Sequence, residues 1–273
     1  VSGDVTHTLD FLGLGDSQVT LGIGSNGTGQ GNHALVGLDL DVQRAEVRVS
    51  NESGLHFAGD PGVGYRLLGF IPMFVSGVLF FGIFQQQFTV MTIYSDVRLD
   101  RHMFGWEIPP SLVQSINPIF IVIFSAVFAT MWTKLGDRQW STPVKFGVAN
   151  IVIGISLFFF LPFSGAEANS TPMYVIIFIL FLFTMAELLL SPVGNALATK
   201  VAPVAFPSRM MAVWMMAVAM GTSLAGSLAS FYNPDDAGAE NTFFISLGVV
   251  SIVLGAILLV LSRWVVKKFS TFR

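Results

Sequence analysis

The residues best suited to chemistry in this sequence form a polar stripe inside a long apolar run. Thr184, Glu187, Ser191, Asn195 and Thr199 recur at spacings of three and four, which places them on one face of a helix. An ionisable side chain at membrane depth costs roughly 2.5–3.5 kcal/mol, so its default interpretation is functional. We expect the stripe to face water or a substrate. The alternative is a structural carboxylate that hydrogen-bonds a neighbouring helix.

A second polar cluster lies in the stretch "FFGIFQQQFTVMT". In a continuous helix Gln85, Thr89 and Thr92 share one face. Gln86 and Gln87 then point in other directions, so the three glutamines cannot all line one cavity. Hydrogen bonds that join helices and contact with a substrate both remain possible interpretations.

Three further features have two interpretations each. Asn117, which precedes a proline, is either a helix cap or a cavity amide, and Trp214 is either an interfacial anchor or a cavity wall. Thr222, Gly226 and Ser230 repeat every four residues, a pattern that favours close helix packing over a role in binding.

The composition is that of a membrane protein. The 273 residues are 53% hydrophobic and only 11% charged, whereas soluble domains carry about 25% charge, and the mean hydropathy is +0.69. The net charge of −3 gives no reason to expect a nucleic-acid partner. Cysteine is absent, and no zinc-protease, phosphate-loop or cofactor motif occurs. We therefore expect neither an enzyme nor a protein with a metal or cofactor.

Six apolar segments follow one another after residue 66. They cover residues 67–94, 112–133, 143–163, 172–195, 208–231 and 243–266. Each is about 20 residues or longer, which is enough to span a bilayer, and none shows the polar face of a helix in a soluble bundle. We predict an all-α integral membrane protein whose residues 64–273 form a six-helix transmembrane bundle.

Residues 1–63 differ sharply from the rest. They are polar and rich in glycine, and alternating runs over residues 33–50 are typical of strands. His7, His33 and His56 lie here at spacings that fit no metal motif. We expect a separate segment with some β-structure, whose role the sequence does not indicate.

The basic residues indicate how the bundle is oriented. If the six segments alternate, ten of the twelve Lys and Arg residues after residue 63 fall on one side, and only Arg98 and Arg101 fall on the other. The positive-inside rule then places the C-terminus in the cytoplasm and the acidic loop "NPDDAGAEN" outside. We expect a multi-pass protein of the plasma (inner) membrane, with the lipid bilayer as its surroundings.

The stretch "AELLLSPVGNALATKVAP" resembles the signature of the proton-dependent oligopeptide transporter family, a branch of the major facilitator superfamily. That signature has a glutamate four residues before Ser-Pro-x-Gly, followed by Thr-Lys-x-Ala-Pro, on the tenth helix of the family. "QSINPIFIVIFSAVFATMWTKLG" and "LFFGIFQQQFTV" are similar to the eighth and seventh helices. The resemblance runs from about Arg66 to Arg273.

The resemblance implies the C-terminal six-helix half of a twelve-helix transporter that moves di- and tripeptides with protons by alternating access. It implies that Glu187 receives the peptide's amino terminus and takes part in proton coupling, and that Ser191, Asn117, Trp214 and Gln85 belong to the substrate site. The groups for the peptide's carboxylate would lie in the N-terminal half, which is absent here. We therefore expect a fragment of a longer transporter, inactive without its other half or a self-association that replaces it.

One departure from the family pattern concerns the seventh helix. The family often has a Trp-x-x-x-Glu-Gln pattern there, and the matching positions are Phe81, Gln85 and Gln86. Because an amide carries no proton at physiological pH, coupling would run through other groups, Glu187 included, or differ in this branch. A transporter of nitrate or another small solute with the same fold is one alternative, and a membrane protein that transports nothing is the other.

Overall fold

The computed structural model describes residues 5–7, 19–21, 63–103, 105–201 and 207–270. The chain divides into two units, residues 1–59 and 60–273, which are described separately. In the first unit, β1 (Val5–His7) pairs antiparallel with β2 (Val19–Leu21). The strands predicted within residues 33–50 lie outside the described residues, as do His33 and His56, so the expected β-rich character has no support beyond these two short strands.

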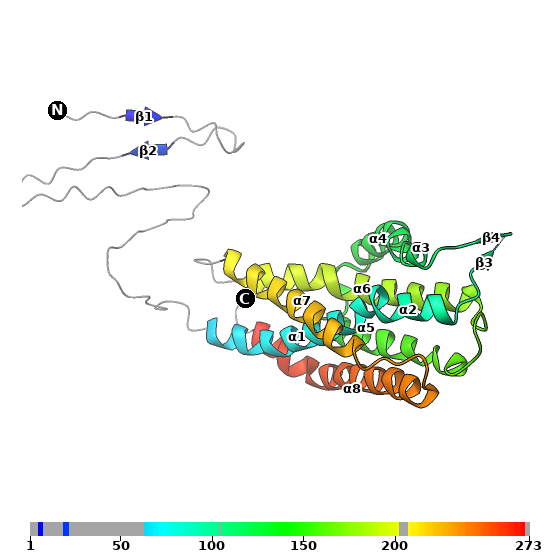
Figure 1. The fold of residues 1–273 in the computed structure, drawn as a ribbon. Coiled ribbons are helices and arrows are strands. Elements are labelled where there is room, and N and C mark those ends of the chain that lie inside the picture. The colour runs from blue at the N-terminus through cyan, green and yellow to red at the C-terminus, as the bar shows by residue number, and fades with distance from the viewer. Residues whose placement is uncertain (1–4, 8–18, 22–62, 104, 202–206, 271–273) are drawn as a thin grey trace, which may run out of the picture. The chain divides into compact units, whose positions relative to one another are not determined.

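The second unit is almost entirely helical, as Figure 1 shows. Its helices are α1 (Val63–Phe84), η2 (Gln85–Phe88), α2 (Val90–Val97), α3 (Pro110–Val113), α4 (Ile116–Leu135), η3 (Gly136–Arg138), α5 (Thr142–Phe158), η4 (Leu161–Phe163), α6 (Met173–Val201), α7 (Pro207–Ala229) and α8 (Ala237–Ser270). Between α2 and α3, a small hairpin pairs β3 (His102–Met103) with β4 (Trp106–Glu107).

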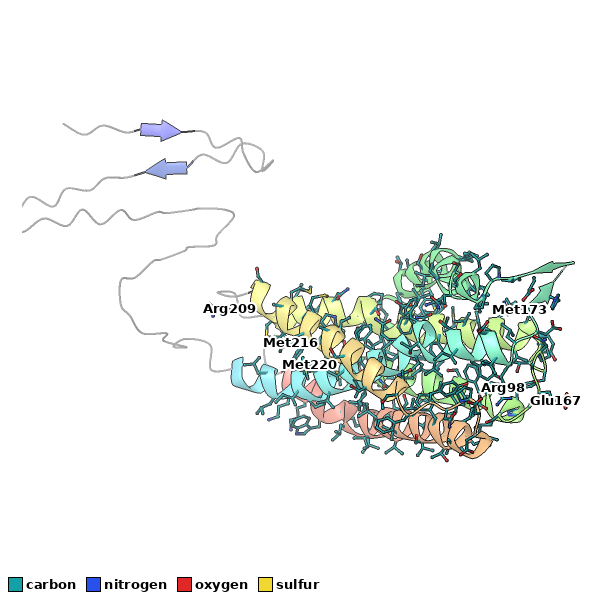
Figure 2. All side chains as sticks on the ribbon, in the orientation of Figure 1. Arg98, Glu167, Met173, Arg209, Met216 and Met220 are labelled. Carbon is teal, nitrogen blue, oxygen red and sulfur yellow. The ribbon has the colours of Figure 1, made fainter. Side chains whose placement is uncertain are left out.

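Six of these helical stretches are long and apolar enough to cross a membrane. They are Leu67–Val97, Pro110–Leu135, Thr142–Phe163, Met173–Val201, Ser208–Ala229 and Ala237–Phe269. Each coincides with one predicted segment, so the predicted number and position of the spans are confirmed. Arg209 and Arg98 lie at opposite ends of the bundle in Figure 2, as the alternation of the spans requires.

Glycines allow α5 and α8 to run close together along their lengths (Figure 1). A Cβ atom at Gly154 would lie 2.8 Å from the carbonyl oxygen of Gly248, and one at Gly255 would lie 2.6 Å from that of Gly147. Only glycine fits at such distances, so two Gly pairs fix how closely these helices approach. The two glycines on each helix are seven residues apart.

The small-residue face of α7 does not pack as expected. Thr222, Gly226 and Ser230 are exposed, and a Cβ atom at Gly226 would meet nothing within 4 Å in the described part of the chain. Instead, α7 approaches α1 at Gly221, where a Cβ atom would lie 2.6 Å from Cβ of Phe81. Among the described residues only Thr222 of this face bonds another helical element, at Gln85, so the prediction of close helix packing has no support within the described chain.

A buried ion pair joins three connections at one end of the bundle. The Arg98 guanidinium lies 3.1 Å from Oε2 of Glu240 and donates to the carbonyl oxygens of Ala166 and Pro234. Oε2 of Glu240 also accepts from the Ser164 hydroxyl at 3.0 Å. These bonds tie the end of α2 to the α5–α6 and α7–α8 connections.

Glu240 lies in the acidic stretch "NPDDAGAEN", whose predicted position outside the membrane the structure does not test. Its side chain is fully buried. Its Oε1 accepts from the Tyr232 hydroxyl at 2.9 Å. Burial, together with the charge of Glu240, raises the pKa of Tyr232, so this tyrosine stays neutral and keeps donating.

Candidate functional site

The polar stripe follows α6 from the core of the bundle to its surface. Thr184 is fully buried, Glu187 and Ser191 are partly exposed, and Asn195 and Thr199 are exposed. The predicted helix is continuous, and Pro192 lies within it, where its missing N–H leaves the carbonyl of Leu188 without a helical donor. The stripe therefore leads inward and ends at a buried hydroxyl.

Asn117 connects this stripe to two other helical elements. Its side chain is 2% exposed. Its Oδ1 accepts from the Thr184 hydroxyl at 2.6 Å, and its Nδ2 donates to Oε1 of Gln87 at 2.8 Å. The helix cap interpretation is wrong, because Ser115 is the N-cap of α4. Asn117 is instead the centre of a hydrogen-bond network that joins η2, α4 and α6.

The Glu187 carboxylate lies beside this network. Its side chain contacts the Asn117 amide, while its Oε2 is buried and has no hydrogen-bond partner among the described residues. No Lys or Arg of the described chain lies within 4.0 Å of it. A buried acceptor without a donor is unfavourable and rare in folded proteins. This carboxylate is thus one turn from Thr184 and able to accept from a further donor.

The three glutamines are held by different neighbours. Nε2 of Gln85 donates to the Thr222 hydroxyl at 3.2 Å, and Nε2 of Gln86 donates to the carbonyl oxygen of Ala225 at 3.1 Å, so both join η2 to α7. Gln87 instead reaches Asn117 on α4. These contacts support the interpretation that the amides join helices.

The segment η2 also changes the predicted face of the first span. A 3-10 segment has a different period from an α-helix, so the spacing rule does not carry across it. The Thr89 hydroxyl accordingly donates to Oε1 of Gln86 at 2.9 Å, whereas Thr92 accepts from Gln114. The prediction that Gln85, Thr89 and Thr92 form one face was wrong.

Trp214 and Ser191 occupy different environments. Trp214 is 1% exposed and packs edge-on against Phe81 and Phe146. A Cβ atom at Gly194 would lie 2.1 Å from its ring, so the glycine on α6 creates the space for the indole. Trp214 is a core residue in this structure, while Ser191 is partly exposed on the same stripe as Glu187.

A pocket of about 490 Å³ lies near this site but does not include it. Its walls contain Leu188, Pro192 and Val193 of α6 but neither Glu187 nor Ser191. In the described part of the chain, no group of three or more His, Asp or Glu residues could hold a metal ion.

Sequence reasoning missed Gln87 as a member of the site. Oε1 of Gln87 accepts a hydrogen bond from the buried amide of Asn117, although 30 residues separate the two residues. Nε2 of Gln87 is buried without a partner among the described residues. Only the presence of two amides in neighbouring apolar segments signalled this pairing, and such a signal cannot choose among partners.

The comparisons with known proteins agree on one family. The model of the POT family matches residues 58–245. The uncharacterized transporter YclF of Bacillus subtilis (strain 168) is 39% identical over 199 residues, which cover 72% of this chain and 40% of that protein. The di-/tripeptide transporter of Lactococcus lactis subsp. cremoris is 36% identical over 216 residues, which cover 76% of this chain and 42% of that protein.

Solved structures give the same result. The crystal structure of a mutant of peptide transporter POT in complex with alafosfalin is 33% identical, with a TM-score of 0.71, and the match covers 77% of this chain and 43% of that one. A POT family transporter in complex with 5-aminolevulinic acid is 35% identical, with a TM-score of 0.69. That match covers 76% of this chain and 43% of the other. This chain thus spans about two fifths of the length of the relatives it matches. Because the model of the POT family matches this chain over most of the chain's length, the chain belongs to the POT family.

Proposed function

We propose that this chain is the C-terminal six-helix half of a proton-coupled transporter of di- and tripeptides that works by alternating access. In such transporters two helical bundles rock around a site near the middle of the membrane. The names of relatives support the substrate class, since matched proteins are called di-/tripeptide transporters. The proposal places this activity in the complete transporter, because a single bundle cannot enclose the site.

One observation carries the proposal: the buried Oε2 of Glu187 has no hydrogen-bond partner in the described chain. The amino terminus of a peptide is an ammonium with three donors, and hydrogen bonds between charged groups are among the strongest. A peptide held there satisfies this oxygen, while Asn117 orients the carboxylate. Ser191 lies one turn further along the partly exposed stripe and contacts the same substrate.

Proton coupling follows from the same carboxylate. When Glu187 is ionised it holds the ammonium, and when it is protonated that attraction is lost. Gln85 takes no part as a proton carrier, since an amide does not titrate; it binds Thr222 and shapes the wall on the α7 side. Trp214 supports the site from the core by packing against α6.

The basic residues also support an orientation of the chain in the membrane. The C-terminus lies in the cytoplasm and the bundle spans the plasma (inner) membrane, because the ends of the helices that carry most of the Lys and Arg residues face inward. The two exceptions, Arg98 and Arg101, are each paired with carboxylates. Residues 1–63 form a separate segment that precedes this bundle, residues 64–273.

Uptake by the complete transporter tests the assignment. We expect Glu187→Gln to reduce accumulation of labelled dialanine at least about tenfold, the effect of losing one hydrogen bond to a charged group. Glu167→Gln is the matched control, because Glu167 is an exposed carboxylate in the α5–α6 connection. We expect that variant to match the wild type. Normal uptake by Glu187→Gln would show that Glu187 is structural.

Competition separates the peptide assignment from the alternatives. Excess unlabelled dialanine should abolish uptake of a labelled dipeptide, while nitrate should leave it unchanged. Inhibition by nitrate but not by dialanine would assign the chain to a transporter of another small solute.

A further inference from the structure

The pocket of about 490 Å³ lies where α4 ends and α5 begins. Its walls come from the second halves of α4 and α6, from the α4–α5 connection and from the first turn of α5. This volume lies within the roughly 300–1,000 Å³ typical of pockets for small organic molecules. It is separate from the site around Glu187, which is not part of its lining.

A buried cation lies in this pocket. Lys145 is only 6% exposed. Its Nζ donates to Oε1 of Gln139 at 3.0 Å and lies 3.7 Å from the centre of the Trp132 ring. No carboxylate of the described residues forms an ion pair with it. Burying a charge without an opposite charge is costly, and an ammonium can donate three hydrogen bonds. The pocket therefore holds a positive charge that is only partly compensated.

A second cation increases this imbalance. Lys200, in the last turn of α6, lines the same pocket, and its charge repels that of Lys145. The N-terminus of α5 also points its partial positive charge toward this end of the bundle. An anion placed between the two ammonium groups would neutralise both and remove their repulsion.

The remaining walls are apolar. Phe128 of α4 and Leu188, Val193 and Leu197 of α6 also line the pocket. Trp140 also lines the pocket and has half of its surface exposed, as expected for an aromatic residue at the membrane interface. An inorganic anion would leave these apolar walls in contact with water, whereas a ligand with an acidic head and a hydrocarbon chain fits both parts.

We propose that this pocket binds an anionic phospholipid, with its phosphate between Lys145 and Lys200 and an acyl chain against Phe128 and the apolar side of α6. The position supports a lipid, because the pocket lies at the ends of membrane-spanning helices, where headgroups are found. Basic pockets between transmembrane helices are an established way of binding acidic headgroups. One turn before the pocket, toward the middle of the membrane, α4 exposes Val122, over which the acyl chain continues.

Lipid binding to the purified complete transporter tests this proposal. The delipidated protein is titrated with phosphatidylglycerol or phosphatidylcholine, and bound lipid is counted by native mass spectrometry. We expect the wild type to prefer phosphatidylglycerol and Lys145→Gln to bind it about tenfold more weakly, as for the loss of one charged hydrogen bond. Lys134→Gln is the control, since Lys134 is an exposed cation at the end of α4 outside the pocket, and it should bind as the wild type does.

A second variant keeps the test independent of the folding of Lys145→Gln. Ala196 is exposed on α6 and lines the pocket, so Ala196→Trp fills the space without changing any charge. It should also lose phosphatidylglycerol. The proposal is overturned if both variants bind the lipid as the wild type does, or if phosphatidylcholine binds equally well. Displacement of phosphatidylglycerol by millimolar inorganic phosphate would assign the pocket to a soluble anion instead.

Discussion

The Thr184 hydroxyl on α6 lies 2.6 Å from Oδ1 of Asn117 on α4. The two residues are 67 positions apart in the sequence, and both are buried. Through Asn117 the contact continues to Gln87 of η2. One chain of hydrogen bonds therefore joins η2 and α4 to α6, the helix that carries Glu187.

Removing the hydroxyl tests this network. Thr184→Val leaves Oδ1 of Asn117 buried without its donor, and an unsatisfied buried group costs about 1–3 kcal/mol. We expect a clear drop in the melting temperature of the purified complete transporter. Thr242→Val is the matched control, because Thr242 is an exposed helical threonine of α8, and we expect a change of about 0.5 kcal/mol or less. Equal effects of the two variants would show that the network does not stabilise the site.

The buried pair of Arg98 and Glu240 should contribute far more than a surface pair. Arg98→Met leaves the carboxylate of Glu240 uncompensated, and breaking a buried pair costs about 3–5 kcal/mol. Arg101→Met provides the comparison, since its partners Asp96 and Glu107 are 68% and 55% exposed and exposed pairs contribute at most about 1 kcal/mol. Thermal unfolding should rank the two variants in that order.

The double variant Arg98→Met with Glu240→Gln checks the cause of that loss. It removes both charges, so it should be more stable than Arg98→Met alone. A double variant that is less stable than the single one would mean that the bonds of Glu240 to Tyr232 and Ser164 outweigh the cost of its unpaired charge.

The raised pKa of Tyr232 predicts that the protein loses stability at alkaline pH. Its pKa is raised in the folded state, whereas a tyrosine in the unfolded chain loses its proton near about pH 10. Above that pH the unfolded state binds fewer protons than the folded state, so the free energy of unfolding falls as the pH rises. We expect melting temperatures measured between about pH 8 and about pH 11 to fall less in Tyr232→Phe than in the wild type. The same slope in both proteins would contradict the prediction, and Tyr174→Phe, at an exposed tyrosine, should leave the slope unchanged.

Two helical glycines should respond in opposite ways to alanine. At Gly194 the new methyl group would lie 2.1 Å from the Trp214 ring, while at Gly226 it would meet nothing within 4 Å. Gly194→Ala should therefore destabilise the bundle by about 1–3 kcal/mol. Gly226→Ala should be neutral or stabilising by up to about 1 kcal/mol, because alanine has the higher helix propensity. If Gly194→Ala has no effect on the melting temperature, the packing of Trp214 against α6 is not as described.

The six spans and the stripe on α6 were predictable because each depends on residues near one another in the sequence. Apolar length alone locates the spans, and the three-and-four spacing aligns Glu187 with Thr184 and Ser191. The break at η2 was not predictable, since Gln85–Phe88 contains neither the proline nor the glycine that usually marks a helix interruption.

The buried polar contacts could not be predicted for a different reason. Arg98 and Glu240 are 142 positions apart, and Glu240 lies in an acidic stretch that reads as a solvated loop. Similarly, Asn117 has suitable amide and hydroxyl groups on several helices, and only the three-dimensional arrangement selects Gln87 and Thr184. In both cases the pattern shows which groups need partners but not which partners they find.

The most direct test of the central claim compares two peptides that differ only at the amino terminus. Competition for uptake is measured with dialanine and with N-acetyl-dialanine, in the wild-type complete transporter and in Glu187→Gln. If the free carboxylate oxygen of Glu187 binds the peptide ammonium, the wild type should prefer dialanine by at least about tenfold, the effect of one charged hydrogen bond, and Glu187→Gln should lose most of that preference. A variant that still discriminates between the two peptides as strongly as the wild type would contradict the account.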